Sequence, residues 1–273
     1  MQYKLGMVLS GGGARGLVHA GVLQAMAEQG IEPQVLAGSS AGAIVAALHG
    51  GGYSGEEILE FFVEKNPLRL SKLSLVKPGI FDTDKAVGDF LEYFPENTFE
   101  ALKKRIFLAA TDIVEAKPEI FGSGPLIPAI LASASTPLLF TPTEIDGHWY
   151  SDGGIVNNFP VEPLLGHCDL IFGVYATPLR RIVEPDLRNS LSVSQRAFEI
   201  GMYYSSKRKF HQCDLLLCPT ELSRFGTFDT KHFQEIMQIG YRAAQEQMET
   251  ILRLLGRGEG GPDDTQAESQ LPS

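Results

Sequence analysis

Short apolar runs alternate with longer amphipathic stretches along residues 1–255 of this chain. The almost wholly apolar runs are residues 5–9, 35–37, 106–110, 170–176 and 215–218. Runs of this length and composition are typical of strands buried on both faces of a sheet. The stretches between them carry apolar residues at helical spacing, so we predict the α/β class, with a three-layer α/β/α sandwich around a mostly parallel central sheet.

The end of the second predicted strand carries the run Gly38-Ser39-Ser40-Ala41-Gly42, which leads into an apolar helical stretch. A strand that turns sharply into a helix through a serine forms a nucleophile elbow, in which a Cβ at either flanking glycine would crowd the turn. The helix would direct its N-terminal N–H groups at developing negative charge. Short Gly-x-Ser-x-Gly matches also arise by chance in glycine-rich chains, so the assignment of Ser40 depends on its context.

The end of the first predicted strand carries three consecutive glycines, Gly11, Gly12 and Gly13. Their backbone N–H groups are unshielded and can converge on an anion. With Gly16 they also satisfy G-x-G-x-x-G, but a dinucleotide site needs an acidic residue at the end of the second strand, and Glu32 falls before it. An oxyanion loop beside a serine nucleophile explains both glycine-rich turns, whereas nucleotide binding leaves the second unexplained.

The run Asp152-Gly153-Gly154 follows a segment, residues 144–150, that we expect to be a strand. Glycines directly after an aspartate suit a tight turn that holds the carboxylate at a strand end, and Gly153 would support that turn. The same sequence is common in surface hairpins. Asp152 is the candidate base for Ser40.

Histidine is the usual proton carrier between a serine and an acid, and the chain has six of them. His167, His211 and His232 follow Asp152, as the Ser-Asp-His order would require. This order is that of the α/β-hydrolase fold, in which the elbow usually comes after several strands. Here the elbow follows the second predicted strand. We therefore favour a dyad, and we expect His19 to pack in its helix or to brace the glycine loop, not to act as a ligand. Histidines, cysteines and carboxylates show no metal-ligand spacing, so we predict neither a metal nor a cofactor.

Taken in this order, the three motifs resemble the bacterial patatin-like phospholipases, which are lipid acyl hydrolases with a Ser-Asp dyad. The resemblance extends over residues 4–180, and further matching runs are Ala109-Ala110-Thr111-Asp112, Ser133-Ala134-Ser135-Thr136-Pro137 and Asn157-Asn158-Phe159-Pro160-Val161. It implies catalysis by Ser40 and Asp152 through an acyl-serine intermediate, with Gly11, Gly12, Gly13 and Arg15 at the oxyanion hole. Gly38, Gly42 and Gly153 would support the turns.

The implied substrate is a phospholipid or lysophospholipid. Two alternatives stay open: an acyltransferase or thioesterase that uses the same acyl-Ser40, and a non-catalytic protein that binds a nucleotide or a lipid. The Asp-Gly-Gly turn favours hydrolysis, because acyltransferases of the wider fold pair the elbow serine with a histidine. Both candidate catalytic residues are present, which argues against a non-catalytic protein.

We expect one hydrolase domain, residues 1–255, and a disordered tail, residues 256–273, which is nearly devoid of apolar residues. Within the domain, residues 53–105 form a candidate cap over the site. Its aromatic residues are mostly expected in the core, with some lining an acyl pocket. The candidates are Phe61, Phe62, Phe81, Phe90, Tyr93, Phe94 and Phe99, followed by residues 125–131 and 138–140.

The formal net charge is −10, and the short basic clusters do not favour nucleic acid as a partner. The clusters are Lys103-Lys104-Arg105, Arg180-Arg181 and Lys207-Arg208-Lys209. Each suits a solvated surface, and each is also a candidate contact for anionic lipid headgroups. Three cysteines are an odd number and suggest reduced thiols in the core. With neither a cleavable leader nor a stretch of ~20 apolar residues, we expect a protein that is either cytoplasmic or peripherally associated with a membrane. The sequence does not predict its oligomeric state.

Overall fold

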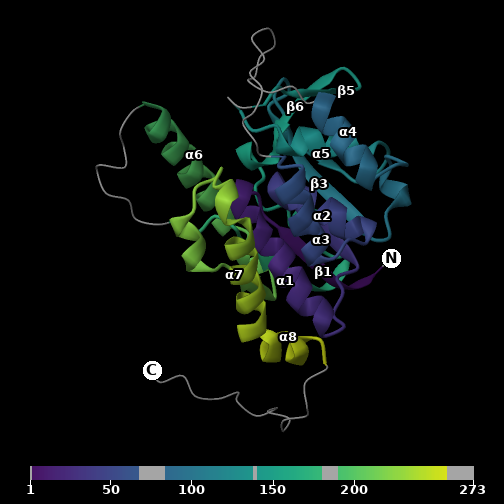
Figure 1. Cartoon of the computed structure of the whole chain (residues 1–273), viewed down its shortest axis with the longest axis vertical. Helices are drawn as coiled ribbons and strands as arrows, with labels where there is room; N and C mark the ends of the chain where they lie inside the picture. The colour runs from purple at the N-terminus through teal and green to yellow at the C-terminus, as the bar shows by residue number, and fades with distance from the viewer. Residues whose placement is uncertain (1, 68–83, 138–139, 180–189, 257–273) are drawn as a thin grey trace, which may run out of the picture.

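A mixed sheet forms the centre of the computed structural model, which describes residues 2–67, 84–137, 140–179 and 190–256 (Figure 1). Its strands run in the order β5-β6-β3-β2-β1-β7-β8, and β4 also pairs with β3. The strands are β1 (Tyr3–Leu9), β2 (Val35–Ser39), β3 (Arg105–Asp112), β4 (Lys117–Phe121), β5 (Thr143–Ile145), β6 (His148–Asp152), β7 (Cys168–Val174) and β8 (Leu215–Leu217). Strands β3, β2, β1, β7 and β8 are mutually parallel, which confirms the predicted α/β class with a mostly parallel sheet.

Two layers of unequal size cover the sheet. The helices are α1 (Leu17–Glu28), α2 (Ala41–Gly51), α3 (Gly55–Glu64), α4 (Asp84–Tyr93), α5 (Leu126–Ala134), α6 (Ser190–Lys207), α7 (Phe233–Glu246) and α8 (Met248–Leu254). In β1, Met7 and Leu9 face the larger layer, which contains α1, α2, α3, α5 and α7. Val8 faces the smaller layer, where Phe159 and the end of α6 pack. This alternation is the period of two that a strand imposes on its side chains.

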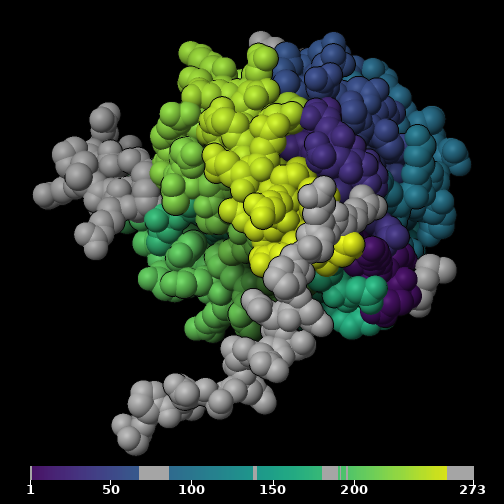
Figure 2. Space-filling view, turned by 90° about the horizontal axis from the view of Figure 1, so that it is seen from below, coloured from purple at the N-terminus to yellow at the C-terminus, as the bar shows by residue number. Residues whose placement is uncertain are grey.

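Two glycines allow α1 and α7 to cross in close contact. A Cβ at Gly21 of α1 would collide with the carbonyl of Met237, and a Cβ at Gly240 of α7 would collide with that of Val18. The C-terminal helices therefore lie directly on the N-terminal part of the chain, as the yellow and purple surfaces of Figure 2 show. This contact holds the start and the end of the domain in one core.

The antiparallel part of the sheet departs from the predicted pattern. Residues 144–150, expected as one strand, instead form the β5–β6 hairpin, which turns at Asp146 and Gly147 with φ of 50° and 81°. An Asp-Gly pair with positive φ at both positions is a favoured hairpin turn. Strand β4 was not predicted, because Lys117, Pro118 and Glu119 interrupt the apolar pattern on a strand that pairs only with β3.

The described parts of the candidate cap, residues 53–67 and 84–105, pack into the main core. Phe61 and Phe62 of α3 are fully buried, and the ring of Phe61 lies 5.3 Å from that of Phe90 in α4. The described aromatic residues of this segment thus have core contacts: Phe61, Phe62, Phe90, Tyr93, Phe94 and Phe99. Phe81, the residues 68–83 around it, Leu138, Leu139 and the predicted tail from residue 257 lie outside the described residues.

Candidate active site

A strained turn places Ser40 between β2 and α2. Ser40 has φ of 52° and ψ of −124°, a conformation that non-glycine residues adopt at a cost of ~1–3 kcal/mol. The turn is too tight for side chains on either flank. A Cβ at Gly38 would lie 2.8 Å from the Cα of Ala43, and one at Gly42 would lie 2.5 Å from the carbonyl oxygen of Ser10. The surrounding backbone therefore fixes the position of the Ser40 hydroxyl.

A methyl group at Gly42 is expected to destabilise the fold, because its neighbours are backbone atoms that cannot rotate away. We expect Gly42→Ala to lower the free energy of unfolding by about 2 kcal/mol or more, measured by urea denaturation. Gly88→Ala is the matched control, since no atom lies within 4 Å of the added methyl group there. That control should be neutral or stabilising by up to about 1 kcal/mol. Equal effects at the two positions would contradict the close approach at Gly42.

The register of the sheet brings Asp152 to Ser40. Strand β2 ends with Ser39 opposite Ala109 of β3, and β6 ends with Asp152 opposite Ala110, the next residue of β3. The two strand ends therefore meet, although they are far apart in the chain. The Ser40 hydroxyl donates to Asp152 Oδ2 at 2.8 Å. The structure thus joins the two residues predicted as nucleophile and base.

Asp152 is buried, and its carboxylate accepts three hydrogen bonds. Besides Ser40, Thr136 Oγ1 donates to Oδ2 at 2.8 Å and the Gly154 N–H donates to Oδ1 at 2.7 Å. Burial raises the pKa of Asp152 above the usual value for aspartate, against these hydrogen bonds, which lower it. A carboxylate with a raised pKa is a stronger base than a solvated one. Its surroundings thus suit proton uptake from a hydroxyl.

The glycine loop lies against Ser40, where a Cβ on Gly11 would come within 3.1 Å of the Ser40 Cβ. The Gly11 N–H donates to the Asn158 carbonyl at 3.2 Å. Within the described ranges, the N–H groups of Gly12 and Gly13 have no acceptor, and neither has that of Ala41, the first residue of α2. Of the three glycines expected at an oxyanion hole, Gly12 and Gly13 therefore keep a free donor, while Gly11 ties the loop to the segment after Asp152.

Arg15 braces this loop from inside. Its Nε donates to the Gly12 carbonyl at 3.4 Å, and one terminal nitrogen donates to Thr227 Oγ1 at 3.2 Å and lies 3.8 Å from a Glu199 carboxylate oxygen. Burial lowers the pKa of Arg15, against Glu199 and Tyr175, which raise it. The guanidinium thus holds Gly12 in place and links the loop to α6.

His19 supports the same loop through Ser10, as expected. The ring is fully buried, and its Nε2 lies 2.7 Å from the Ser10 carbonyl, which requires a proton on Nε2. Burial lowers the pKa of His19 from 6.5 to about 4, against the hydrogen bond with Ser10, which raises it. His19 is therefore neutral at physiological pH.

The low pKa of His19 predicts a pH-dependent loss of stability. Below pH 6.5, His19 is protonated in the unfolded chain but stays neutral in the folded one. The free energy of unfolding therefore falls as the pH decreases toward about 4. The loss at pH 4 is about 3 kcal/mol, since each unit of pKa shift corresponds to about 1.4 kcal/mol. Urea denaturation between pH 7 and 4 should show this slope in the wild type and lack it in His19→Gln. Parallel slopes in both proteins would contradict it.

All six histidines lie within the described residues, and none hydrogen-bonds to Ser40 or Asp152. His148 instead contacts Asp112 at 3.0 Å, and His232 contacts Asp229 at 2.6 Å. The geometry is therefore that of a serine–aspartate pair. No group of three or more His, Cys, Asp or Glu side chains in the described part of the chain is arranged to hold a metal ion.

Three supporting residues were not assigned roles from the sequence. Ser133 Oγ accepts the Ser40 N–H at 3.0 Å and donates to the Ala109 carbonyl at 2.6 Å, which anchors the elbow to β3. Thr136 orients Asp152, and Asn158 accepts the Gly11 N–H. The available signal was their place in the runs around residues 133–137 and 157–161, which match the patatin-like family.

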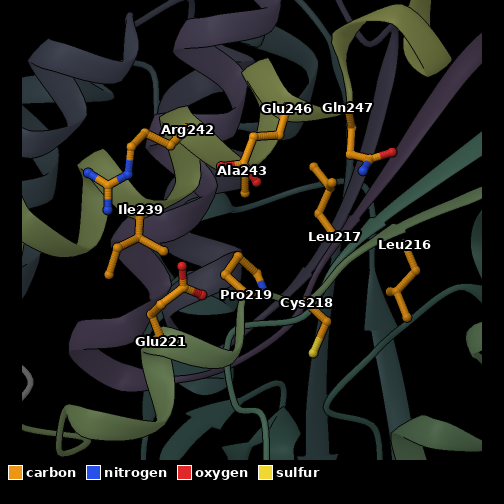
Figure 3. Close-up of a pocket in the computed structure, with 10 residues that line it drawn as sticks. All are labelled: Leu216, Leu217, Cys218, Pro219, Glu221, Ile239, Arg242, Ala243, Glu246 and Gln247. Atoms are coloured by element: carbon orange, nitrogen blue, oxygen red, sulfur yellow. The ribbon is translucent and has the colours of Figure 1, made fainter.

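A separate pocket of about 300 Å³ lies between β8 and α7 (Figure 3). It is lined by Leu216, Leu217, Cys218, Pro219, Glu221, Ile239, Arg242, Ala243, Glu246 and Gln247. None of these residues is among the predicted site residues. The candidate site is therefore defined by the two strand ends and the glycine loop, not by this pocket.

The family model for patatin-like phospholipases matches residues 7–165, a span that includes the glycine loop, Ser40 and Asp152. The chain belongs to the patatin-like phospholipase family. An uncharacterized NTE family protein of Mycobacterium bovis is 34% identical over 174 residues, which are 63% of this chain and 48% of that protein. Lysophospholipase NTE1 of Kluyveromyces lactis is 27% identical, over 87% of this chain and 18% of its own length. This chain thus spans about half the length, or less, of these relatives.

Among solved structures, VipD from Legionella pneumophila superposes with a TM-score of 0.51 and 14% identity. The match covers 94% of this chain and 67% of VipD, and it supports the patatin fold. Within the described ranges, no helix combines the length and the apolarity that crossing a bilayer requires.

Proposed function

We propose that this patatin-like protein is a lipid acyl hydrolase that cleaves the carboxylic esters of phospholipids or lysophospholipids through an acyl-Ser40 intermediate. The observation that carries the proposal is the 2.8 Å hydrogen bond from Ser40 Oγ to Asp152 Oδ2, formed at a strained elbow beside unpaired backbone N–H groups. Family membership supports the lipid class, and one relative is named a lysophospholipase.

Acylation begins when Asp152 takes the proton of Ser40 and the serine oxygen bonds to the ester carbonyl carbon. The carbonyl oxygen gains negative charge, and the N–H groups of Gly12 and Gly13, with that of Ala41 at the start of α2, are the donors suited to hold it. When the tetrahedral intermediate collapses, the carbon–alkoxide bond breaks and Asp152 returns the proton to the departing alcohol. The acyl group is left as an ester of Ser40.

Deacylation repeats these steps with water. Asp152 takes one water proton while the water oxygen bonds to the acyl carbon, and the same N–H groups hold the second oxyanion. Collapse then breaks the bond to Ser40 Oγ, which recovers the proton from Asp152, and a fatty acid departs. The raised pKa of Asp152, caused by burial, supports its use as the base in both halves.

Three readouts test this function on the purified full chain. We expect a fluorophosphonate probe to label one serine, located by peptide mass spectrometry at Ser40, and to block turnover of a short p-nitrophenyl ester and of a lysophospholipid. Free fatty acid should accumulate even when an alcohol acceptor is present. Transfer of the acyl group to the acceptor would instead favour the acyltransferase alternative. A folded protein that neither takes the probe nor turns over any ester would refute the proposal.

A further inference from the structure

The helix α6 turns its apolar side outward. Val193, Ile200 and Tyr204 expose 49%, 38% and 57% of their surface, and Ala197 between them is exposed as well. Their spacing of four, three and four residues places all of them on one face of the helix. Figure 1 shows α6 on the flank of the molecule, on the side opposite α4.

The opposite face of α6 carries the polar contacts. Glu199 lies 3.8 Å from Arg15, which braces the glycine loop, and Arg196 lies 3.4 Å from Glu199. Ser206 is buried, and the ring of Tyr203 packs against that of Tyr175 at 6.1 Å. A surface helix normally buries its apolar stripe and exposes its charges. Here the ion pair with the catalytic loop occupies the inner face and leaves the apolar stripe in contact with solvent.

Two exposed cations lie at the C-terminal end of α6. Lys207 is its last residue, with Nζ 5.8 Å from the ring centre of Tyr203, and Arg208 follows in the next turn. Lys209, the third residue of this basic cluster, is not available, because it contacts Asn157 at 2.7 Å. The chain as a whole has a net charge of −10, so this positively charged helix end differs in sign from the protein as a whole. An apolar face bordered by Lys and Arg is typical of helices that lie in the interface of an anionic membrane.

The segment directly after Asp152 packs against α6. The turn Gly153–Ile155 directly after Asp152 contacts α6, and a Cβ at Gly154 would lie 3.1 Å from Met202 Sδ of α6. Ile155 and Val156 in this stretch are each more than one-third exposed. The stretch beside Asp152 thus packs against α6 through Met202, which lies on the side of the helix away from Ile200 and Tyr204.

We propose that the outward face of α6, formed by Val193, Ala197, Ile200 and Tyr204 with Lys207 and Arg208 at its end, docks the protein on an anionic phospholipid membrane. Docking rests on the proposed function for its purpose but is measured without turnover. The apolar side chains would enter the interface between headgroups and acyl chains, and the two cations would contact anionic headgroups.

The test is co-flotation of the full chain with phosphatidylcholine vesicles, with and without phosphatidylglycerol. Ile200→Glu/Tyr204→Glu should lower binding to both kinds of vesicle by about tenfold or more, since it removes the two largest apolar side chains that would enter the membrane interface. Lys207→Gln/Arg208→Gln should lower binding to the anionic vesicles by about 25-fold, at roughly fivefold per cation, and leave binding to neutral vesicles unchanged. Val63→Glu is the matched control, because Val63 is at least as exposed as Ile200 and Tyr204, at 60%, but lies on α3.

Hydrolysis of a short soluble ester should be the same in all these variants, because none of the changed side chains contacts Ser40 or Asp152. Wild-type binding by Ile200→Glu/Tyr204→Glu would overturn the docking surface, and so would a wild type that floats with neither vesicle. In either case, continued hydrolysis of the soluble ester would leave the proposed function intact. If the wild type is a dimer by light scattering and Ile200→Glu/Tyr204→Glu a monomer with unchanged flotation, the face binds a second copy and the membrane proposal fails.

Discussion

Replacing Ser40 by alanine is expected to lower ester hydrolysis by about 10⁴-fold or more, because no acyl intermediate can form without the hydroxyl oxygen. Fluorophosphonate labelling should disappear as well. The fold should survive, since Asp152 keeps its hydrogen bonds from Thr136 and Gly154 and the elbow already accommodates a side chain at this position. The measurements are kcat/KM for a short p-nitrophenyl ester, probe labelling, and the melting temperature.

Ser39→Ala is the matched control for this experiment. It is the same substitution one residue earlier, at a fully buried serine whose hydroxyl has no hydrogen-bond partner in the described structure. It should retain activity to within about tenfold, because the hydroxyl of Ser39 takes no part in the proposed chemistry. Full turnover by Ser40→Ala, or equal losses in both variants, would contradict the assignment of Ser40 as nucleophile.

Asp152→Asn is expected to lower kcat/KM by roughly 10³–10⁴-fold, as the loss of the acid does in other serine hydrolases. Asparagine has nearly the same shape and still offers an oxygen to Thr136 or Gly154, but it cannot take up a proton. The variant should therefore remain folded and bind ligands normally. Activity close to that of the wild type would show that Asp152 is not the base.

The thermal stability of Asp152→Asn distinguishes a catalytic role of Asp152 from a structural one. Burial raises the pKa of Asp152, so the folded chain holds its proton at pH values where the unfolded chain, with a pKa near 3.8, has lost it. The contribution of this group to stability is thus complete below pH 3.8 and is lost as the pH rises through the folded pKa. Asp152→Asn removes the cost of burying an ionised carboxylate. We therefore expect its melting temperature at pH 7 to match or exceed that of the wild type. If the Asp152 carboxylate instead stabilised the fold, Asp152→Asn would melt at a lower temperature than the wild type.

The activity of the wild type should fall at acid pH, because protonated Asp152 cannot act as a base. The acid limb of kcat/KM should lie above the usual range of an aspartate, in the direction of the raised pKa. Thr136→Val provides the companion measurement, since the Thr136 hydrogen bond lowers that pKa. Its removal should move the acid limb to higher pH. An unshifted limb would indicate that another group controls the profile.

The sequence was most informative where structure is set by neighbouring residues. The five apolar runs were found as β1, β2, β3, β7 and β8 because a strand buried on both faces needs a continuous apolar run. Strand β4 was not predicted because it is partly polar. The β5–β6 hairpin was predicted as one strand because its Asp-Gly turn is only two residues long. Edge and antiparallel strands carry a weaker pattern, since one of their faces meets solvent.

By itself, the sequence determined which residues end the strands and which of them have the required chemistry: three glycines, a serine between glycines, and an aspartate before glycines. These are local properties, set by side-chain volume and backbone freedom over a few positions. Only the tertiary structure decided that Asp152 meets Ser40, since the pair is 112 positions apart and joined by the register of β2 and β6 on β3. It also decided that Gly11 donates to Asn158 and that α6 exposes its apolar face, because both depend on which distant group occupies the other side.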